Sequence, residues 1–251
     1  MSLPLHPFSP PCRRRWPDLV RPLVLAALLS LAPFGLVACA ADQKQAAMGC
    51  GSSSAPCLSG TAVVSLETSK GEVQLSLDGG AAPLTAGNFV DLVKRGTYNG
   101  TVFHRVVRDP VPFVVQGGDP ASADPKVPVS QYGTGDFLDP VTGETRQIPL
   151  ELKLSKEPLP RYGQPLSSPV LNRDLVLTHQ RGAVAMARSN NPNSASAQFY
   201  VALEALPELD GRYAVFGRVT KGMEVIDRIQ QGDRIVKAKV IEGGTLVKGQ
   251  P

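Results

Sequence analysis

The sequence predicts a mainly β protein, a closed antiparallel β-barrel of about eight strands capped by two α-helices. Most apolar runs are short, rich in β-branched residues and bounded by glycine, proline or asparagine, which is typical of strands joined by turns. Only residues 83–95 and 223–231 carry apolar residues at helical spacing. Short strands of this kind favour a sheet that closes on itself, with the helices covering its ends.

Residues 1–38 are predicted to be a lipoprotein signal peptide. Four arginines precede residue 22, and residues 22–38 are apolar and uncharged. The sequence Leu-Val-Ala-Cys that ends at Cys39 resembles a bacterial lipobox, so Cys39 is the expected lipidation site. An uncleaved membrane helix is the alternative, but this apolar run contains a proline and a glycine and is marginal for spanning a membrane.

Residues 39–60 are expected to form a flexible tether from the lipidated Cys39, because they are mostly alanine, glycine, serine and glutamine. Cys50 and Cys57 have six residues between them. In an oxidising envelope they could form a local disulfide or remain free thiols, and the sequence leaves both open.

The charge of the chain gives no case for nucleic-acid binding. The formal net charge is +4, but residues 1–38 hold four of the basic residues and one acidic residue, so it falls to +1 without them. No basic stripe interleaved with aromatic residues remains.

The folded domain is expected to span residues 61–251. Residues 61–66 and 71–77 are apolar runs joined by a short turn, which predicts a β-hairpin. The helix over 83–95 has a proline at its start and Gly96 just past its end.

A proline-rich loop insertion is expected around residues 108–180, since eleven of the 23 prolines lie between 110 and 170. A hairpin is predicted within it near Val141–Glu144. The insertion could shape a partner surface or be a solvated addition without a role, and the sequence does not decide between them.

The segment 101–107 reads Thr-Val-Phe-His-Arg-Val-Val and predicts a strand. Alternation puts Arg105 on the same face as Phe103 and Val107. Because a guanidinium beside apolar side chains needs stacking or hydrogen bonds, Arg105 indicates a polar ligand, with a snorkelling surface arginine as the alternative.

The segment 182–203 predicts a strand, a polar loop and a second strand. In the second strand, the alternation puts two sets of side chains on opposite faces. The more open face holds Gln198, Tyr200 and Ala202, and the core face holds Phe199, Val201 and Leu203. Residues 209–219 then give an Asp-Gly turn and another strand.

These motifs together resemble the cyclophilin family of peptidyl-prolyl isomerases, and its bacterial members more than its animal ones. The resemblance covers roughly residues 61–249 and rests on the order and spacing of several short motifs. They are Phe-His-Arg at 103–105, Gln-Gly-Gly-Asp at 116–119, Met-Ala at 186–187, Gln-Phe-Tyr at 198–200 and Leu-Asp-Gly at 209–211. The resemblance implies a cyclophilin-like barrel and isomerisation of X-Pro bonds.

The resemblance also implies a site. Arg105, Phe113 and Gln116 would be catalytic, with Gln116 fixing a substrate carbonyl. The proline ring would lie against apolar and aromatic walls, namely Phe113, Val114, Tyr200 and Leu209, with Tyr213 at the edge. The substrate backbone before the proline would pair with a strand and loop that include Ala187, Arg188, Ser189 and Gln198.

Isomerisation needs no bond cleavage, metal or cofactor. As the X-Pro bond twists, the proline nitrogen gains a lone pair, so a donor aimed at it binds the twisted state better than a planar one. A charge-assisted hydrogen bond from Arg105 contributes about 1.5 to 3 kcal/mol. A 10⁵-fold acceleration needs about 7 kcal/mol, so Arg105 cannot suffice alone, and something must also hold the proline and turn its flank.

No zinc site is expected. Two histidines follow the signal peptide, His104 and His179, and His104 is predicted to be structural because it alternates away from Arg105. No paired carboxylates indicate hydrolysis.

Departures from the family pattern leave an alternative. Residues 108–112 lengthen the turn between Arg105 and Phe113, so a catalytically weak chaperone or scaffold that binds proline peptides is the second hypothesis. Glu208 stands where animal members have a tryptophan, so cyclosporin binding is expected to be weak.

The expected substrates are proline-containing segments of envelope or secreted proteins. The lipid anchor would hold the domain in the bacterial cell envelope, facing the periplasm. Ala40, which follows Cys39, is not an aspartate, so no inner-membrane retention signal is visible and the outer membrane is favoured.

Overall fold

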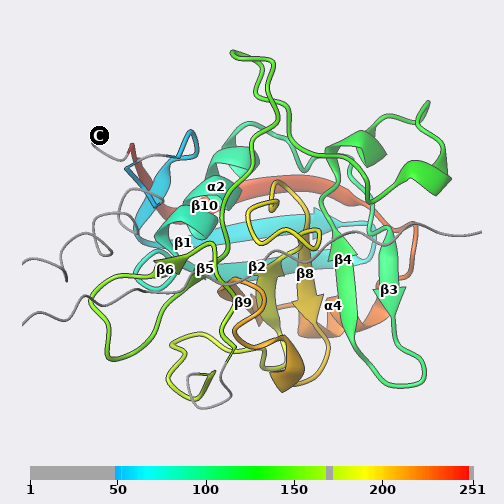
Figure 1. Cartoon of the computed structure of the whole chain (residues 1–251). Helices are drawn as coiled ribbons and strands as arrows, with labels where there is room; N and C mark the ends of the chain where they lie inside the picture. The colour runs from blue at the N-terminus through cyan, green and yellow to red at the C-terminus, as the bar shows by residue number, and fades with distance from the viewer. Residues whose placement is uncertain (1–48, 52, 168–171, 249–251) are drawn as a thin grey trace, which may run out of the picture. The chain divides into compact units, whose positions relative to one another are not determined.

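The computed structural model describes residues 49–51, 53–167 and 172–248 (Figure 1). The predicted signal peptide and Cys39 lie outside the described residues. None of the helices within the described ranges has the length and apolar character needed to cross a membrane.

An antiparallel sheet of eight strands dominates the fold, and its strand order is β10-β1-β2-β9-β7-β8-β4-β3 (Figure 1). Neighbouring β1 and β2 form the hairpin that the sequence predicts. The strands are β1 (Cys57–Thr68), β2 (Gly71–Asp78), β3 (Arg105–Val107), β4 (Val114–Gly117), β7 (Ala183–Met186), β8 (Phe199–Ala202), β9 (Val215–Lys221) and β10 (Ile235–Val247).

The prediction of a closed barrel was wrong, because the two edge strands, β3 and β10, share no ladder. The residues just before these strands are linked by an isolated bridge between Val102 and Arg234 and by neighbouring backbone hydrogen bonds. Side chains interrupt the pairing here. The Ser122 hydroxyl accepts the amide proton of Val102, and the Asn99 side chain accepts that of Ala238. The strand predicted over 101–107 is therefore limited to β3.

Two α-helices occur among the described residues, α2 (Pro83–Lys94) and α4 (Met223–Arg228), as predicted. Helix α4 ends at Arg228, three residues before the predicted end, because the next residue, Ile229, has an extended backbone. Within the described ranges, three 3₁₀ turns lie in the connections: η1 (Pro120–Ala123), η2 (Val129–Gln131) and η3 (Pro207–Leu209).

The main core lies between α2 and the sheet. Phe89 of α2 has its ring centroid 4.8 Å from that of Tyr98 and 5.1 Å from those of Phe199 and Phe216. All four side chains are fully buried. Each aromatic ring removes a large apolar area from water, so this cluster fixes α2 on one face of the sheet.

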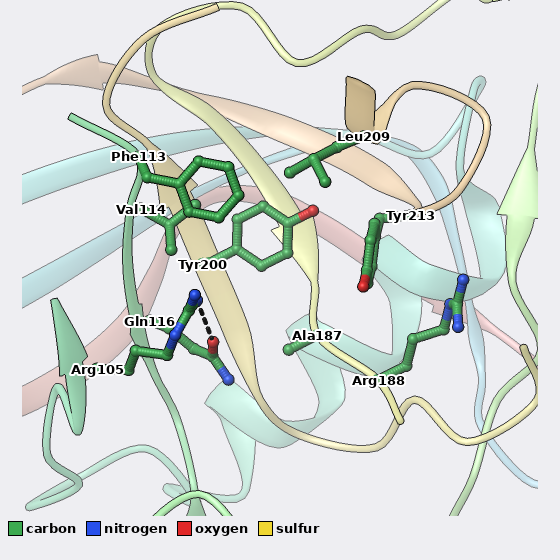
Figure 2. Close-up of a pocket in the computed structure, with 9 residues that line it drawn as sticks. All are labelled: Arg105, Phe113, Val114, Gln116, Ala187, Arg188, Tyr200, Leu209 and Tyr213. Carbon is green, nitrogen blue, oxygen red and sulfur yellow. Dashed lines mark hydrogen bonds between the residues drawn. The ribbon is translucent and has the colours of Figure 1, made fainter. Parts of the chain in front are cut away.

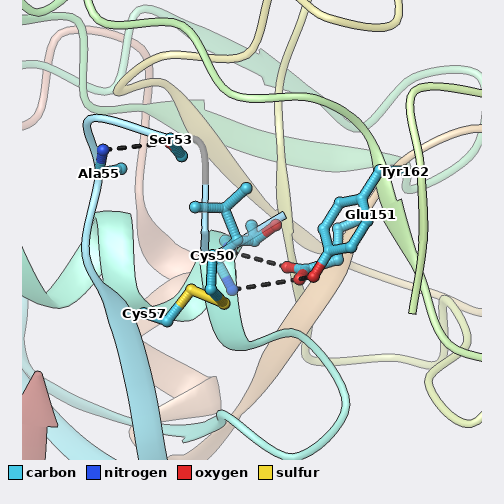
Figure 3. Close-up of a disulfide and its surroundings, with 8 residues drawn as sticks. Cys50, Ser53, Ala55, Cys57, Glu151 and Tyr162 are labelled. Atoms are coloured by element: carbon cyan, nitrogen blue, oxygen red, sulfur yellow. Dashed lines mark hydrogen bonds between the residues drawn. A yellow bond between two sulfur atoms is a disulfide. The ribbon is translucent and has the colours of Figure 1, made fainter. Parts of the chain in front are cut away.

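A disulfide joins Cys50 to Cys57, with 5.7 Å between the Cα atoms (Figure 3). Strand β1 begins at Cys57, four residues before the predicted start, so residues 57–60 belong to a strand and not to the expected tether. The disulfide ties the segment around Cys50 to the first strand of the sheet, which resolves the alternative that the sequence left open.

The insertion supplies the cap of helix α2. The residue before the helix, Ala82, has no capping side chain. The buried carboxylate of Glu151 accepts the amide protons of Leu84 and Thr85 at 3.1 and 2.7 Å, and the hydroxyl of Tyr162 donates to it at 2.9 Å (Figure 3). Glu151 and Tyr162 lie on a small two-stranded sheet, formed by β5 (Glu151–Leu152) and β6 (Arg161–Tyr162).

A second part of the insertion is fixed to α2 by Arg146, whose side chain is 2% exposed. Its guanidinium donates to Asp91 of α2 at 2.6 Å and to Asp139 at 3.1 Å. It also lies 4.7 Å from the centroid of the Phe137 ring. Asp139 begins the hairpin turn predicted near Val141, and its amide donates to the Glu144 carbonyl at 2.9 Å. Glu151 and Arg146 therefore attach the insertion to the core helix, which contradicts the view of it as a solvated addition.

His104 is partly buried beside Gly133 and has no direct role in the pocket described below. Neither of its ring nitrogens has a hydrogen-bond partner among the described residues. Burial lowers the pKa of the His104 imidazole, so the neutral form is favoured in the folded state.

We predict that Arg146→Met lowers the free energy of unfolding by about 3 kcal/mol, because Asp91 and Asp139 lose a buried cationic partner. Urea unfolding measures the change. Arg95→Met is the matched control, since Arg95 also pairs with Asp91 but its side chain is 38% exposed. The control should lose less than about 1 kcal/mol. Equal losses for both variants would show that Arg146 does not anchor the insertion.

We also predict that His104 makes the protein less stable at acid pH. With a lowered pKa, the folded state stays neutral while the unfolded chain already binds a proton, so stability falls as the pH drops below about 6.5. The slope for one histidine reaches at most about 1.4 kcal/mol per pH unit. Denaturant unfolding at pH 7, 6 and 5 should show a shallower loss for His104→Phe, and an unchanged slope would contradict the assignment.

Candidate active site

A pocket of about 240 Å³ opens on the face of β4, β8 and β7 that lies opposite the main core (Figure 2). It contains nine of the eleven residues that the sequence analysis assigned to the site. These are Arg105, Phe113, Val114, Gln116, Ala187, Arg188, Tyr200, Leu209 and Tyr213.

Strand β8 separates the pocket from the core by the alternation that the sequence predicts. Phe199, Val201 and the following Leu203 are fully buried in the main core. Tyr200 and Ala202 point the other way, into a second apolar cluster. One short strand therefore forms the wall of the core and the wall of the pocket.

The pairing of β3 with β4 places Arg105 opposite Gln116. The Arg105 guanidinium donates to the Gln116 side-chain oxygen at 3.3 Å, and its carbon lies 5.8 Å from the centroid of the Phe113 ring (Figure 2). Arg105 is exposed, so its remaining donors can reach a ligand. The arginine is held at the pocket by an aromatic ring and an amide, not by a carboxylate.

The lengthened turn at 108–112 does not displace Phe113. The amide of Phe113 donates to Val107 at 3.0 Å, so the strands remain paired up to the turn. The Arg108 guanidinium donates to the carbonyls of Ile226 and Ile229 at the end of α4, both at 2.9 Å. These bonds fix the base of the turn to a helix and preserve the register between Arg105 and Phe113.

A chain of hydrogen bonds continues from Gln116 away from the pocket. The Gln116 amide donates to the Gln198 oxygen at 3.3 Å, and the Gln198 amide donates to the carbonyls of Gly133 and Gly135, both at 3.0 Å. That loop is held in turn by the buried Asp119, whose carboxylate accepts amide protons from Gly133 and Gly135. Sequence reasoning did not find this role for Asp119.

The remaining two site residues, Ser189 and Gln198, line a second pocket of about 330 Å³. It shares Gln116, Ala187 and Arg188 with the first pocket, so the two pockets lie next to each other.

Two aromatic rings form the wall opposite Arg105. Tyr200 and Tyr213 meet edge to face, with centroids 6.0 Å apart. The Arg188 guanidinium lies 4.7 Å above the Tyr213 ring and donates to the Arg212 carbonyl at 2.6 Å. Arg188 thus supports Tyr213 with a stacked cation. Glu208 is exposed in η3, and the expectation of weak cyclosporin binding stays a prediction.

Sequence reasoning also missed a polar group below the pocket. His179 is buried between the Tyr200 hydroxyl and the Asp210 carboxylate, at 2.9 and 2.8 Å. Burial lowers the pKa of the His179 imidazole, in spite of the neighbouring carboxylate. A lone histidine before a strand and the aspartate of an Asp-Gly turn were the available signals, but their contact spans 31 residues of sequence.

The described part of the chain contains no group of three His, Cys, Asp or Glu side chains placed to hold a metal ion. What the pocket offers is apolar and aromatic wall area on one side and a cationic donor on the other. This arrangement suits an uncharged ring next to an amide whose electron distribution changes.

The comparisons with known proteins agree with this geometry. Residues 63–248 match the family model described as cyclophilin type peptidyl-prolyl cis-trans isomerase. A protein of Synechocystis described as a thylakoid lumen peptidyl-prolyl cis-trans isomerase is 40% identical over 205 residues, covering 77% of this chain and 51% of that protein. A protein of Brucella suis, named as a peptidyl-prolyl cis-trans isomerase, is 33% identical over 187 residues, covering 74% of this chain and 80% of that protein.

A solved structure has the same fold. The cyclophilin type isomerase of Cryptosporidium parvum, crystallised in the presence of the dipeptide Ala-Pro, aligns with a TM-score of 0.52 at 22% identity. The alignment covers 72% of this chain and 99% of that one. This chain spans about half the length of the Synechocystis relative. With the family model matching most of its length, the chain belongs to the cyclophilin-type peptidyl-prolyl cis-trans isomerases.

Proposed function

We propose that this protein isomerises X-Pro bonds in envelope or secreted proteins, by non-covalent stabilisation of the twisted amide. The observation that carries the proposal is the position of Arg105. Its guanidinium lies at the edge of an apolar pocket, bonded to Gln116 and stacked near Phe113, with further donors free to reach a substrate (Figure 2).

The chemistry follows from the loss of amide resonance. A planar X-Pro nitrogen is a poor acceptor, whereas the twisted bond leaves a lone pair on the nitrogen. A donor beside that nitrogen therefore binds the twisted state more tightly, which is the requirement for catalysis. An arginine suits this role because it stays protonated at any physiological pH.

The pocket walls have a separate task. Phe113, Val114, Tyr200 and Leu209 form apolar and aromatic walls of the pocket, so they can hold the proline ring while the preceding carbonyl rotates. In this proposal Gln116, which is hydrogen-bonded to Arg105, holds a substrate carbonyl. We infer that the substrate backbone before the proline lies along Ala187–Ser189, toward the pocket that Gln198 lines.

The alternative of a catalytically weak chaperone or scaffold depended on a displaced Phe113. The bonds from Arg108 to the end of α4 keep the longer turn in place, and Phe113 lines the pocket with Arg105. This geometry favours catalysis over binding alone.

We expect Arg105→Ala to lower the catalysed exchange rate of an Ala-Pro peptide about ten- to hundredfold, the effect of losing one charge-assisted hydrogen bond. NMR exchange spectroscopy measures the rate, and peptide titration measures binding in the same samples. Arg218→Ala is the matched control, since Arg218 is exposed on β9 outside the pocket. A wild type that binds the peptide without accelerating exchange would establish the binding-module alternative instead.

We further propose that Cys39 anchors the domain to the cell envelope on the periplasmic side, with the outer membrane favoured. The lipobox-like sequence supports this, as does the disulfide between Cys50 and Cys57, which is typical of an oxidising compartment. The similar Synechocystis protein is itself described as a thylakoid lumen protein.

The anchor predicts that the full chain takes up radiolabelled palmitate and stays with membranes after a high-salt wash, because several acyl chains bind a bilayer stably. Cys39→Ser should abolish the label and release the protein from the membrane. Cys12→Ser, which changes another cysteine of the signal segment, should leave the label in place. Labelling of the Cys39→Ser chain would refute lipidation at this residue.

A further inference from the structure

Three polar groups form a hydrogen-bonded row directly behind the pocket wall. The Tyr200 oxygen lies 2.9 Å from Nε2 of His179, and Nδ1 of His179 lies 2.8 Å from Oδ1 of Asp210. His179 is 1% exposed, and the rings of His179 and Tyr200 are nearly parallel. The mechanism proposed above uses the Tyr200 ring as a pocket wall but gives no role to the Tyr200 hydroxyl, His179 or Asp210.

The proton positions in the row follow from its chemistry. An ionised carboxylate only accepts hydrogen bonds, so Nδ1 carries a proton and donates to Asp210. Burial lowers the pKa of His179, so the ring is neutral and Nε2 is an acceptor. The Tyr200 hydroxyl therefore donates to Nε2. Asp210 thus fixes the tautomer of His179, and with this tautomer Nε2 accepts the hydrogen bond that holds the Tyr200 hydroxyl in place.

The row also joins two walls of the pocket that come from distant parts of the chain. Tyr200 lies on β8, and Asp210 belongs to the turn after η3. The Leu209 carbonyl at the end of η3 accepts the amide protons of Arg212 and Tyr213, so Leu209 and Tyr213 are both hydrogen-bonded within this turn. His179 is bonded to both sides, and Asp210 also accepts the backbone amide proton of His179 at 2.8 Å.

We propose that His179 is a positioning residue of the site, which sets the distance between the Tyr200 ring and the wall formed by Leu209 and Tyr213. This inference rests on the proposed isomerase function. The width between these walls decides how closely a proline ring fits. Gln116 pairs with Tyr200 across β4 and β8, but among the described residues no side-chain hydrogen bond joins Arg105 or Gln116 to the row. Loss of the bond between His179 and the Tyr200 hydroxyl therefore removes no hydrogen bond of the donor that acts on the twisted bond.

This separation predicts a particular kinetic signature. The walls contact the proline ring in the planar and the twisted states alike, so loosening them weakens binding uniformly. KM should rise while kcat stays nearly constant. Loss of Arg105 should lower kcat and leave KM nearly constant, since its hydrogen bond to the proline nitrogen exists only in the twisted state.

The experiment is a double-mutant cycle with His179→Gln and Tyr200→Phe, in which kcat, KM and the peptide Kd are measured on an Ala-Pro peptide. Each single variant should raise KM and Kd about three- to tenfold, the worth of one buried hydrogen bond, and leave kcat within about twofold. The double variant should be no worse than either single one, because His179 acts through the Tyr200 hydroxyl. Tyr162→Phe is the matched control. It removes the hydroxyl of another buried tyrosine, which donates to the Glu151 carboxylate outside the pocket, and should leave KM unchanged.

Additive effects, or variants that lose thermal stability with KM and Kd unchanged, would overturn the inference and leave His179 with a structural role. If His179→Gln does not fold, Tyr200→Phe still tests the KM shift. The ¹⁵N spectrum of the wild-type imidazole provides a second measurement, in which His179 should be neutral at pH 7 with its proton on Nδ1. A proton on Nε2 would refute the proposed hydrogen bond from the Tyr200 hydroxyl to His179. A wild type without isomerase activity would refute the proposed function, while Kd and the tautomer would still test the positioning role.

Discussion

The register between β3 and β4 is the constraint on which the site depends. It sets Arg105 opposite Gln116, and both residues then point toward the pocket. A shift of one residue would turn the arginine to the other face, because side chains alternate along a strand. Strand β3 has only three residues, so the register needs outside support. At the turn, Arg108 gives this support by donating to a carbonyl of α4. At the other end of the strand pair, Gln198 gives it by accepting a hydrogen bond from the Gln116 side chain.

Strand β8 connects the site to the core and keeps the pocket wall rigid. The face of β8 that carries Phe199 and Val201 packs into the aromatic cluster around Phe89, so the strand cannot move without opening the core. The opposite face presents Tyr200 to the pocket, and His179 holds its hydroxyl. The proposed isomerisation forms no covalent intermediate and therefore relies on walls and donors that are already in place, a requirement that this strand satisfies.

The insertion illustrates how a loop-rich segment becomes part of a core. Glu151 satisfies two backbone donors at the start of α2, where the helix has no cap of its own, and Arg146 neutralises Asp91 on the same helix. Burial raises the pKa of the Glu151 carboxyl even though its hydrogen bonds favour the charged form. The insertion therefore stabilises helix α2, which supports the sheet, although the insertion and the helix are far apart in the sequence.

The sequence by itself determined the hairpin of β1 and β2, the strands β7, β8 and β9 and the two helices, because alternation and turn residues are local properties. Phe199 and Tyr200 were assigned to opposite faces in this way, and the structure places them so. The pocket residues followed from the resemblance to a known family, which rests on the order and spacing of short motifs. Only the tertiary structure decided that the sheet does not close, that Glu151 caps α2 and that His179 joins Tyr200 to Asp210. Each of these depends on which partner a polar group meets across many residues of chain. Local pattern cannot specify that partner, since any buried donor can be satisfied by a backbone or a side chain that only the fold brings near.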